Sequence, residues 1–231
     1  FTAYPNVLDA SSHANNATGS AGNAGSTGKA CWVGNPLRTI FMQQSAPEQR
    51  MAGRTGKLQL LVVGGSLGAK ALNDTVPQAL ALLDEAQRPH VMHQSGAKQI
   101  DALRQAYAQA GVVATLLPFI DNTAEAFAQA DLVVCRAGAS TVTELAAVGA
   151  AAVFVPFPSA VDDHQTTNAQ FLVQAGGGWL LQQRDMTAQG LAQMLQNMER
   201  TALINRALEA KKMQKTNATH EVVAACEALA A

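Results

Sequence analysis

The sequence lacks several features that mark membrane, nucleic-acid-binding or disulfide-rich proteins. No run of 18 apolar residues occurs in the 231-residue chain, so no segment predicts a membrane-spanning helix. The net charge of −1 provides no general attraction to nucleic acid or to an anionic membrane. The three cysteines, Cys31, Cys135 and Cys226, lie far apart without C-x-x-C spacing. They argue against a disulfide framework or a zinc site and favour a reducing, cytosolic compartment.

The first 31 residues differ in composition from the rest. The chain begins at Phe1 rather than at Met and carries no signal-peptide pattern, so we expect the C-terminal part of a longer protein. Ala10 to Ala30 is mostly Ala, Ser, Asn, Gly and Thr, which cannot bury enough apolar surface to offset the entropy of ordering. We therefore predict a flexible insertion there, within an interdomain remnant at 1–31, followed by a single domain at 32–231.

From Leu58 onward, short apolar runs alternate with segments of helical periodicity. The predicted strands are Leu58–Val63, Pro89–His93, Val112–Leu117, Leu132–Cys135, Ala151–Phe157 and Trp179–Gln182. The predicted helices are Ala69–Leu83, Ala97–Ala110, Thr123–Gln129, Ser140–Val148 and Asp163–Ala175, with two or three more to the end. This order predicts an α/β fold, a Rossmann-like, doubly wound parallel sheet with helices on both faces. Ligands of such sheets bind beyond the carboxyl ends of the strands, so the loops after the strands are the candidate site.

The first candidate is the loop Gly64–Ala69, between a buried strand and a helix. Its glycines allow close approach of a ligand, and the following helix N-terminus offers N–H groups suited to phosphate. Ser66 is placed to cap the helix or to donate to a phosphate oxygen. A plain Gly-rich turn is the structural alternative. An NAD site is unlikely, because the glycines do not fit G-x-G-x-x-G and the second strand ends in His93-Gln94 rather than in an acid.

The same loop also fits a second hypothesis, that the protein is a serine hydrolase. Gly64-x-Ser66-x-Gly68 matches the G-x-S-x-G nucleophile elbow, and Asp131 and His164 follow in the chain order of a triad. Against this reading, only one strand precedes Ser66, whereas such an elbow normally follows several.

The second candidate is Cys135–Glu144, which follows an apolar strand and opens a helix. Gly138 to Thr141 would present donors to a pyrophosphate, and Glu144, one turn further on, would accept hydrogen bonds from two ribose hydroxyls. The structural alternative is a capping box formed by Ser140 or Thr141 with Glu144. Arg136 is placed to offset phosphate charge or to pair with a surface acid.

Three further segments carry polar or turn residues at predicted corners. The segment 154–168 runs from a strand into Asp, His, Gln and Asn side chains, which suit sugar hydroxyls or simply begin a helix. Gly34–Arg38 is a turn that ends in an arginine. Pro118–Asp121 is a strand-to-helix corner whose backbone would meet a base edge, although core packing is the expected role of the Phe119 side chain.

Six motifs occur in order on these elements. They are Gly34–Arg38, Gly64–Ala69, His93–Gly96, Pro118–Asp121, Cys135–Glu144 and Asp163–Asn168. Together they resemble the MurG family of peptidoglycan glycosyltransferases, over roughly residues 32 to 200. That family transfers N-acetylglucosamine (GlcNAc) from UDP-GlcNAc to lipid I to form lipid II, in cell-wall synthesis, and has the two-domain GT-B architecture. The chain is similar to its C-terminal, donor-binding domain.

The resemblance implies a role for each site residue. Arg38 and Ser66 would contact the pyrophosphate side of the donor, the Ile120 backbone would recognise uracil, and Glu144 would hold the ribose. Gln165, with His164, would hold the GlcNAc hydroxyls. The turn that receives the pyrophosphate would consist of Ala139, Ser140, Thr141, Val142 and Thr143. Leu67 departs from the family, since many members carry Gln there, and this puts one polar donor contact in doubt.

The resemblance also implies what lies outside the chain. The family is inverting and metal-independent, uses no cofactor, and works peripherally at the cytoplasmic face of the bacterial inner membrane. Its N-terminal domain supplies the catalytic base, the lipid I site and the membrane-binding patch. We therefore expect no catalytic residue in this chain, no nucleic-acid partner, and no transferase activity of this fragment alone.

Overall fold

The computed structural model describes residues 2–4, 31–158 and 163–230. The insertion predicted at Ala10–Ala30 lies outside these residues. The chain forms two compact units, one of Phe1–Leu37 with Lys215–Ala231 and one of Arg38–Gln214. The boundary predicted between residues 31 and 32 stays a prediction. No helix among the described residues is long and apolar enough to cross a membrane.

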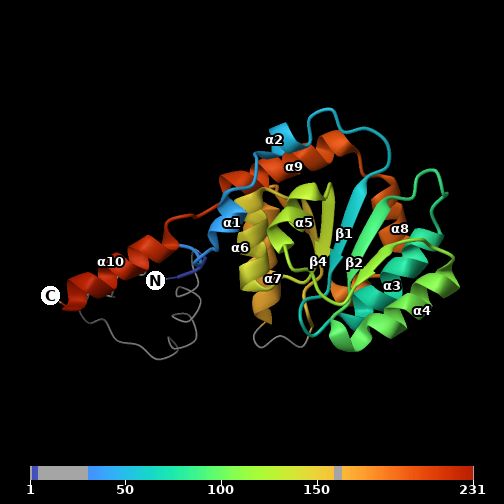
Figure 1. The fold of residues 1–231 in the computed structure, drawn as a ribbon, viewed down its shortest axis with the longest axis horizontal. Helices are drawn as coiled ribbons and strands as arrows, with labels where there is room; N and C mark the ends of the chain where they lie inside the picture. Colours follow the sequence, from blue (N-terminus) through green and yellow to red (C-terminus); the bar gives the residue numbers. More distant parts are fainter. Residues whose placement is uncertain (1, 5–30, 159–162, 231) are drawn as a thin grey trace, which may run out of the picture. The chain divides into compact units, whose positions relative to one another are not determined.

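The larger unit contains a six-stranded, wholly parallel sheet with the order β3-β2-β1-β4-β5-β6 (Figure 1). The strands are β1 Gln59–Val63, β2 His90–Gln94, β3 Thr115–Leu117, β4 Leu132–Cys135, β5 Ala152–Phe154 and β6 Gly178–Leu180. The strand order reverses between β1 and β4, as expected of a doubly wound fold. All six predicted strands and the parallel sheet are therefore confirmed.

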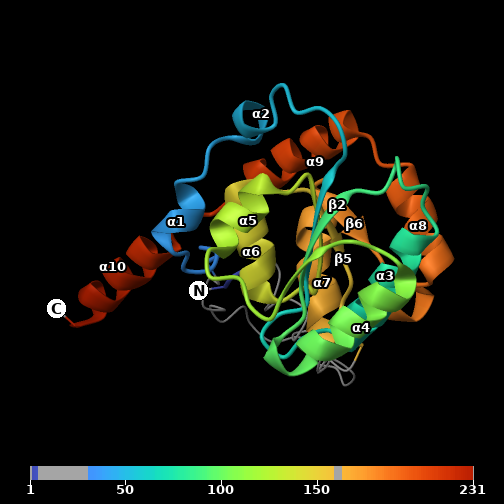
Figure 2. The same ribbon diagram turned by 45° about the vertical axis from the view of Figure 1, so that its right-hand side comes forward.

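Helices cover both faces of the sheet. Figure 2 shows α3, α4 and α8 along one face and α5 and α6 along the other, with α9 across the top of the view. The principal helices are α3 Lys70–Ala81, α4 Ile100–Ala110, α5 Thr123–Gln129, α6 Ala139–Val148, α7 His164–Gln174, α8 Ala188–Gln196 and α9 Arg200–Lys212. Short helices occur at α1 Thr39–Met42, α2 Pro47–Arg50, η2 Ala97–Gln99 and η4 Gln183–Asp185. The smaller unit carries α10 Ala218–Ala230.

The strands β3 and β5 are several residues shorter than predicted, because the flanking residues do not continue the ladder. Val112 donates its N–H to the Tyr107 carbonyl, so it completes the C-terminal turn of α4 after the left-handed Gly111. At the other strand, Pro156 has no N–H to continue the ladder beyond β5. Strand β4 is buried along its whole length, which explains its unbroken apolar sequence.

The amino-terminal edge of the sheet is fastened by Asp131, which precedes β4. Its buried carboxylate lies 3.1 Å from Nη1 of Arg54 and 3.0 Å from Nη2 of Arg200. The same carboxylate accepts a hydrogen bond from the Gln59 N–H at 2.8 Å. Arg200 also donates to the carbonyls of Arg54, Gly56 and Lys57. One carboxylate thus links the starts of β1 and β4 to α9.

Candidate functional site

The carboxyl ends of β1 and β2 lead into two loops that touch through their backbones. Gly68 has a φ of +77°, and a Cβ on it would lie 2.2 Å from the Ser95 carbonyl oxygen. Gly96, at φ +84°, would bring a Cβ to 2.7 Å from the Gly68 nitrogen. Glycine is therefore required at both positions by conformation and by space. The Gly64–Ala69 loop is held rigidly against the loop that follows β2.

A pocket of about 110 Å³ lies at this edge of the sheet, next to the loop. It is lined by Val63, Gly65, Ser66, Gln94, Phe119, Ile120 and Thr123. The pocket brings together Ser66 and Ile120, which the sequence places on separate motifs. Core packing of Phe119 was the wrong expectation, because this side chain is 62% exposed. Ser66 does not cap the following helix, since Ala69 is its N-cap and no side chain closes it.

Helix α6 begins at the same edge, with Gly138 as its N-cap and no side-chain cap hydrogen bond. The capping box is therefore the wrong reading of this segment. Val142 is fully buried, and the Thr143 hydroxyl donates to the Ala139 carbonyl at 2.9 Å. The Val142 N–H donates a hydrogen bond to the Gly138 carbonyl. Ser140, in the first turn, is exposed. The first turn is thus the part of α6 that offers N–H groups outward.

Glu144, one turn further on, pairs with Arg38. Oε1 of Glu144 lies 3.6 Å from Nη2 of Arg38, whose guanidinium lies over the Phe41 ring at 4.9 Å. The Glu144 side chain is 19% exposed and that of Arg38 is 65% exposed. Burial raises the pKa of Glu144, and the charge and hydrogen bond of Arg38 oppose this rise. The two predicted site residues from opposite parts of the sequence are therefore neighbours.

Arg136 does not stand free for phosphate, and no ion pair joins it to an acid among the residues that the structure describes. It donates to the carbonyls of Val155 and Pro156, both at 3.0 Å, and to Oε1 of Gln183 at 2.6 Å. Its guanidinium also lies 5.5 Å from the Phe157 ring centre. Burial lowers its pKa from the ordinary arginine value. Arg136 holds the chain that leaves β5.

The N-terminus of α7 carries the last two predicted residues. Oε1 of Gln165 accepts a hydrogen bond from the Phe157 N–H at 3.0 Å, so this side chain is attached to the loop after β5. His164 is the first residue of α7 and is exposed. Residues 159–162 lie outside the described part of the chain. The 110 Å³ pocket does not include Arg38, Glu144, His164 or Gln165, so the predicted residues form adjacent groups along one edge rather than one closed cavity.

The serine hydrolase reading is excluded by the sheet. Asp131 precedes β4 and therefore lies at the amino-terminal edge, whereas Ser66 follows β1 at the carboxyl-terminal edge. The Asp131 carboxylate is already occupied by two arginines and a backbone N–H. The three residues of the predicted triad cannot meet.

Two buried side chains near the loop belong to the His93–Gly96 motif, whose residues have no individual role in the sequence prediction. Gln94 is 3% exposed and bonds both to the backbone of Gly65 and to the Pro118 carbonyl. His93 is fully buried between Asn73 and Tyr107, and burial lowers its pKa to about 3. The polar end of β2, in an otherwise apolar strand pattern, was the available signal for both.

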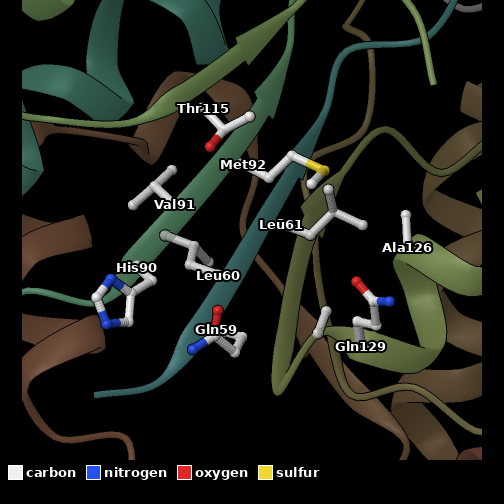
Figure 3. A pocket seen from close by; sticks show the side chains of 10 residues that line it. Gln59, Leu60, Leu61, His90, Val91, Met92, Thr115, Ala126 and Gln129 are labelled. Atoms are coloured by element: carbon white, nitrogen blue, oxygen red, sulfur yellow. The ribbon is translucent and has the colours of Figure 1, made fainter.

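A second hollow lies on the sheet away from these loops. It measures about 130 Å³ and lies beside α5, over β1 and β2. Figure 3 shows Leu61 and Met92 on its floor, with Ala126 and Gln129 of α5 along one side. It contains none of the predicted site residues. Within the described ranges, no group of three or more His, Cys, Asp or Glu side chains is arranged to hold a metal ion.

Comparison with known proteins agrees with this arrangement. The glycosyltransferase family 28 C-terminal domain matches residues 59–224. The UDP-N-acetylglucosamine–N-acetylmuramyl-(pentapeptide) pyrophosphoryl-undecaprenol N-acetylglucosamine transferase of Paracidovorax citrulli is 71% identical over 207 residues, covering 90% of this chain and 58% of the relative. The transferase of the same name from Acidovorax sp. strain JS42 is 64% identical over 230 residues, covering 100% of this chain and 53% of the relative. The chain spans about half the length of these relatives.

Solved structures show the same fold. MurG of Acinetobacter baumannii superimposes with a TM-score of 0.74 at 44% identity, covering 79% of this chain and 53% of that chain. The glycosyltransferase VinC, solved with dTDP, matches with a TM-score of 0.52 at 19% identity, over 80% of this chain and 45% of that one, which shows the fold alone. The chain therefore belongs to the glycosyltransferase family 28 C-terminal domain family, as a MurG homologue with the C-terminal half of the GT-B fold.

Proposed function

We propose that this chain supplies the UDP-GlcNAc site of a transferase that adds GlcNAc to lipid I and so forms lipid II. The observation that carries the proposal is the start of α6, where no side chain caps the helix and Glu144 stands in the following turn. The names of the relatives, which describe GlcNAc transfer to a muramyl-pentapeptide pyrophosphoryl lipid, support the same function.

The diphosphate is assigned to the first turn of α6. Ala139 begins this turn, and Ser140 and Thr141 follow in the part of an α-helix whose N–H groups have no carbonyl four residues earlier within the helix and where the helix dipole is positive. Ser66 adds a hydroxyl from the loop after β1, and Arg38 adds a cation. Such donors stabilise the negative charge that grows on UDP as it leaves. Val142 and Thr143 support this turn from within the helix, since their side chains are buried.

The nucleoside is assigned to Glu144 and Ile120. A carboxylate accepts hydrogen bonds from both hydroxyls of a vicinal diol, which suits the ribose. The backbone of Ile120, at the rim of the 110 Å³ pocket, meets the edge of the uracil. Gln165 and His164, at the start of α7, hold the GlcNAc hydroxyls. Arg38 keeps Glu144 charged by opposing the effect of burial on its pKa.

The remaining steps belong to the other half of the transferase. The catalytic base, the lipid I site and the contact with the cytoplasmic face of the inner membrane are assigned to an N-terminal domain. Transfer is then inverting and needs no metal, because the helix terminus and its neighbours neutralise the leaving diphosphate. This chain alone binds the donor and does not transfer the sugar.

Isothermal titration of the chain with UDP-GlcNAc tests the proposal. We expect saturable binding that is weaker for UDP-glucose, which lacks the acetamido group, and weaker still for dTDP-glucose, which also lacks the ribose 2′-hydroxyl. Equal binding of all three sugars, or no binding of UDP-GlcNAc, would contradict a GlcNAc donor site in this chain.

Donor binding is also expected to depend on the charge of Glu144. As pH falls, protonation removes the carboxylate that accepts the ribose hydrogen bonds, and because burial raises its pKa, affinity falls at a higher pH than for an exposed glutamate. In Arg38→Ala the opposing cation is gone, so the midpoint moves to still higher pH. Titrations of UDP-GlcNAc affinity in a pH series that descends from neutrality measure this. UDP-GlcNAc is preferable to UDP, whose terminal phosphate titrates in the same range.

Glu144→Gln provides the control for this pH series. Its side chain cannot ionise, so the part of the pH dependence that belongs to Glu144 disappears from the profile. A midpoint in Arg38→Ala that equals the wild-type midpoint, or one that moves to lower pH, would show that Arg38 does not control this carboxyl group.

A further inference from the structure

Ser66 lies between two backbone positions that glutamine side chains hold. On one side, Gln94 accepts a hydrogen bond from the Gly65 N–H and donates to the Gly65 carbonyl, both at 3.0 Å. On the other side, Nε2 of Gln99 donates to the Leu67 carbonyl at 3.1 Å. The residues before and after Ser66 are therefore each fixed by an amide side chain. Gln94 also donates to the Pro118 carbonyl at 3.0 Å, which ties the Ser66 loop to the loop of Ile120.

Gln99 is in turn oriented from the interior. Its Oε1 accepts a hydrogen bond from Nδ2 of Asn73 at 2.7 Å, so its Nε2 must point the other way, toward Leu67. Asn73 is 4% exposed and lies in α3, the helix that the loop opens into. An exchange of the Gln99 oxygen and nitrogen would place two donors together and two acceptors together. The amide orientation of Gln99 is therefore determined.

The orientation of Asn73 in turn fixes the tautomer of a buried histidine. Oδ1 of Asn73 lies 3.0 Å from Nε2 of His93, and Nδ1 of His93 lies 3.0 Å from the Tyr107 hydroxyl. Because Nδ2 of Asn73 donates to Gln99, its Oδ1 must accept, which makes His93 the Nε2–H tautomer. Burial keeps His93 neutral, with a pKa lowered to about 3, so Tyr107 donates to Nδ1. Every donor in this chain of hydrogen bonds points from Tyr107 toward Leu67.

We propose that Gln94 and Gln99 form a clamp that positions Ser66 for the donor diphosphate, and that Asn73 and His93 set the direction of its outer half. Gln99 and Asn73 are positioning residues, since they act on the donor through the loop backbone. The inference rests on the proposed function, because the diphosphate is the ligand that the loop is held ready to meet. A preformed loop spares the donor the entropy of ordering it.

Gln99→Met tests the clamp with little change in side-chain size. Gln99 is only partly buried, so the fold tolerates the change, and thermal unfolding is expected to stay close to wild type. Gln99→Glu is a stronger variant, because a carboxylate oxygen would face the Leu67 carbonyl. Gln105→Met, on an exposed position of α4, is the matched control. Two quantities are measured on each variant: UDP-GlcNAc affinity, and amide hydrogen exchange of Gly68 by NMR without donor. The Gly68 N–H donates to the Gly65 carbonyl and shares a peptide unit with the Leu67 carbonyl that Gln99 holds.

We expect Gln99→Met to speed exchange at Gly68 and to weaken UDP-GlcNAc binding, each about two- to tenfold, as for the loss of one hydrogen bond. Gln99→Glu should change both quantities more than Gln99→Met does, and Gln105→Met should have the exchange rate and the affinity of wild type. Unchanged exchange in Gln99→Met, or faster exchange with unchanged affinity, would overturn the inference. If exchange rises while even the wild-type chain fails to bind UDP-GlcNAc, the clamp stands as a feature of the loop and the proposed donor is wrong.

Discussion

Glu144→Ala is expected to weaken binding of UDP-GlcNAc by about 10- to 100-fold. The carboxylate is assigned two hydrogen bonds from the ribose, and hydrogen bonds to charged groups contribute about 1.5–3 kcal/mol. The side chain is 19% exposed and lies beside Arg38, so the substitution removes a largely buried carboxylate. Calorimetric titration of the purified chain measures the change. Glu144→Gln keeps the size and one acceptor oxygen, and we expect it to fall between wild type and Glu144→Ala.

A ligand change distinguishes the ribose contact from a general loss of structure. The 2′-deoxyribose analogue of UDP-GlcNAc should bind wild type more weakly than the natural donor, whereas Glu144→Ala should bind the two nearly equally. Glu209→Ala, which removes an exposed acid paired with Lys212 on α9, should leave both affinities unchanged. If Glu144→Ala still prefers the natural donor by the wild-type factor, Glu144 does not bind the ribose.

The sheet could be predicted from sequence because its signals are local. Continuous apolar runs that end in glycine or proline, such as Leu60–Val63 before Gly64, fix both the kind and the place of a strand. The predicted bounds of a strand were wrong where a residue has the composition of a strand but belongs to another element. Val112 has the composition of a strand but serves the last turn of α4. The assignment of Val112 depends on its hydrogen bond to the Tyr107 carbonyl, and the pattern of apolar residues in the sequence does not predict that bond.

The candidate site was predictable as a set of loops but not as a set of contacts. Parallel topology brings Ser66 and Ile120 to one edge because each follows a strand. The Arg38–Glu144 pair joins segments far apart in the chain, and nothing in either segment specifies the other. The triad hypothesis, by contrast, conflicts with the predicted strands themselves. Asp131 precedes a strand and Ser66 follows one, and a parallel sheet places these positions at opposite edges.

Asp131→Ala is expected to lower the free energy of unfolding by about 3–5 kcal/mol, as when one partner of a buried ion pair is removed. The substitution leaves Arg54 and Arg200 without their carboxylate, and it leaves the Gln59 N–H without its acceptor. The side chains of Arg54 and Arg200 are 24% and 17% exposed, so water replaces the lost carboxylate only in part. Urea denaturation followed by circular dichroism measures the loss. Asp131→Asn, which keeps the shape and one acceptor, should lose less.

Asp74→Ala is the control, because the ion pair of Asp74 with Lys70 is shorter than the two ion pairs of Asp131 but is exposed. The separation is 2.6 Å, with the side chains 51% and 80% exposed, and such surface pairs contribute at most about 1 kcal/mol. A loss of similar size in the two variants would show that burial does not matter at Asp131. Below its unfolding temperature, Asp131→Asn should bind UDP-GlcNAc as wild type does, because Asp131 fastens the amino-terminal edge and the donor loops leave the carboxyl-terminal edge. A parallel sheet separates these two roles by the length of its strands, so stability and donor affinity should respond to different substitutions.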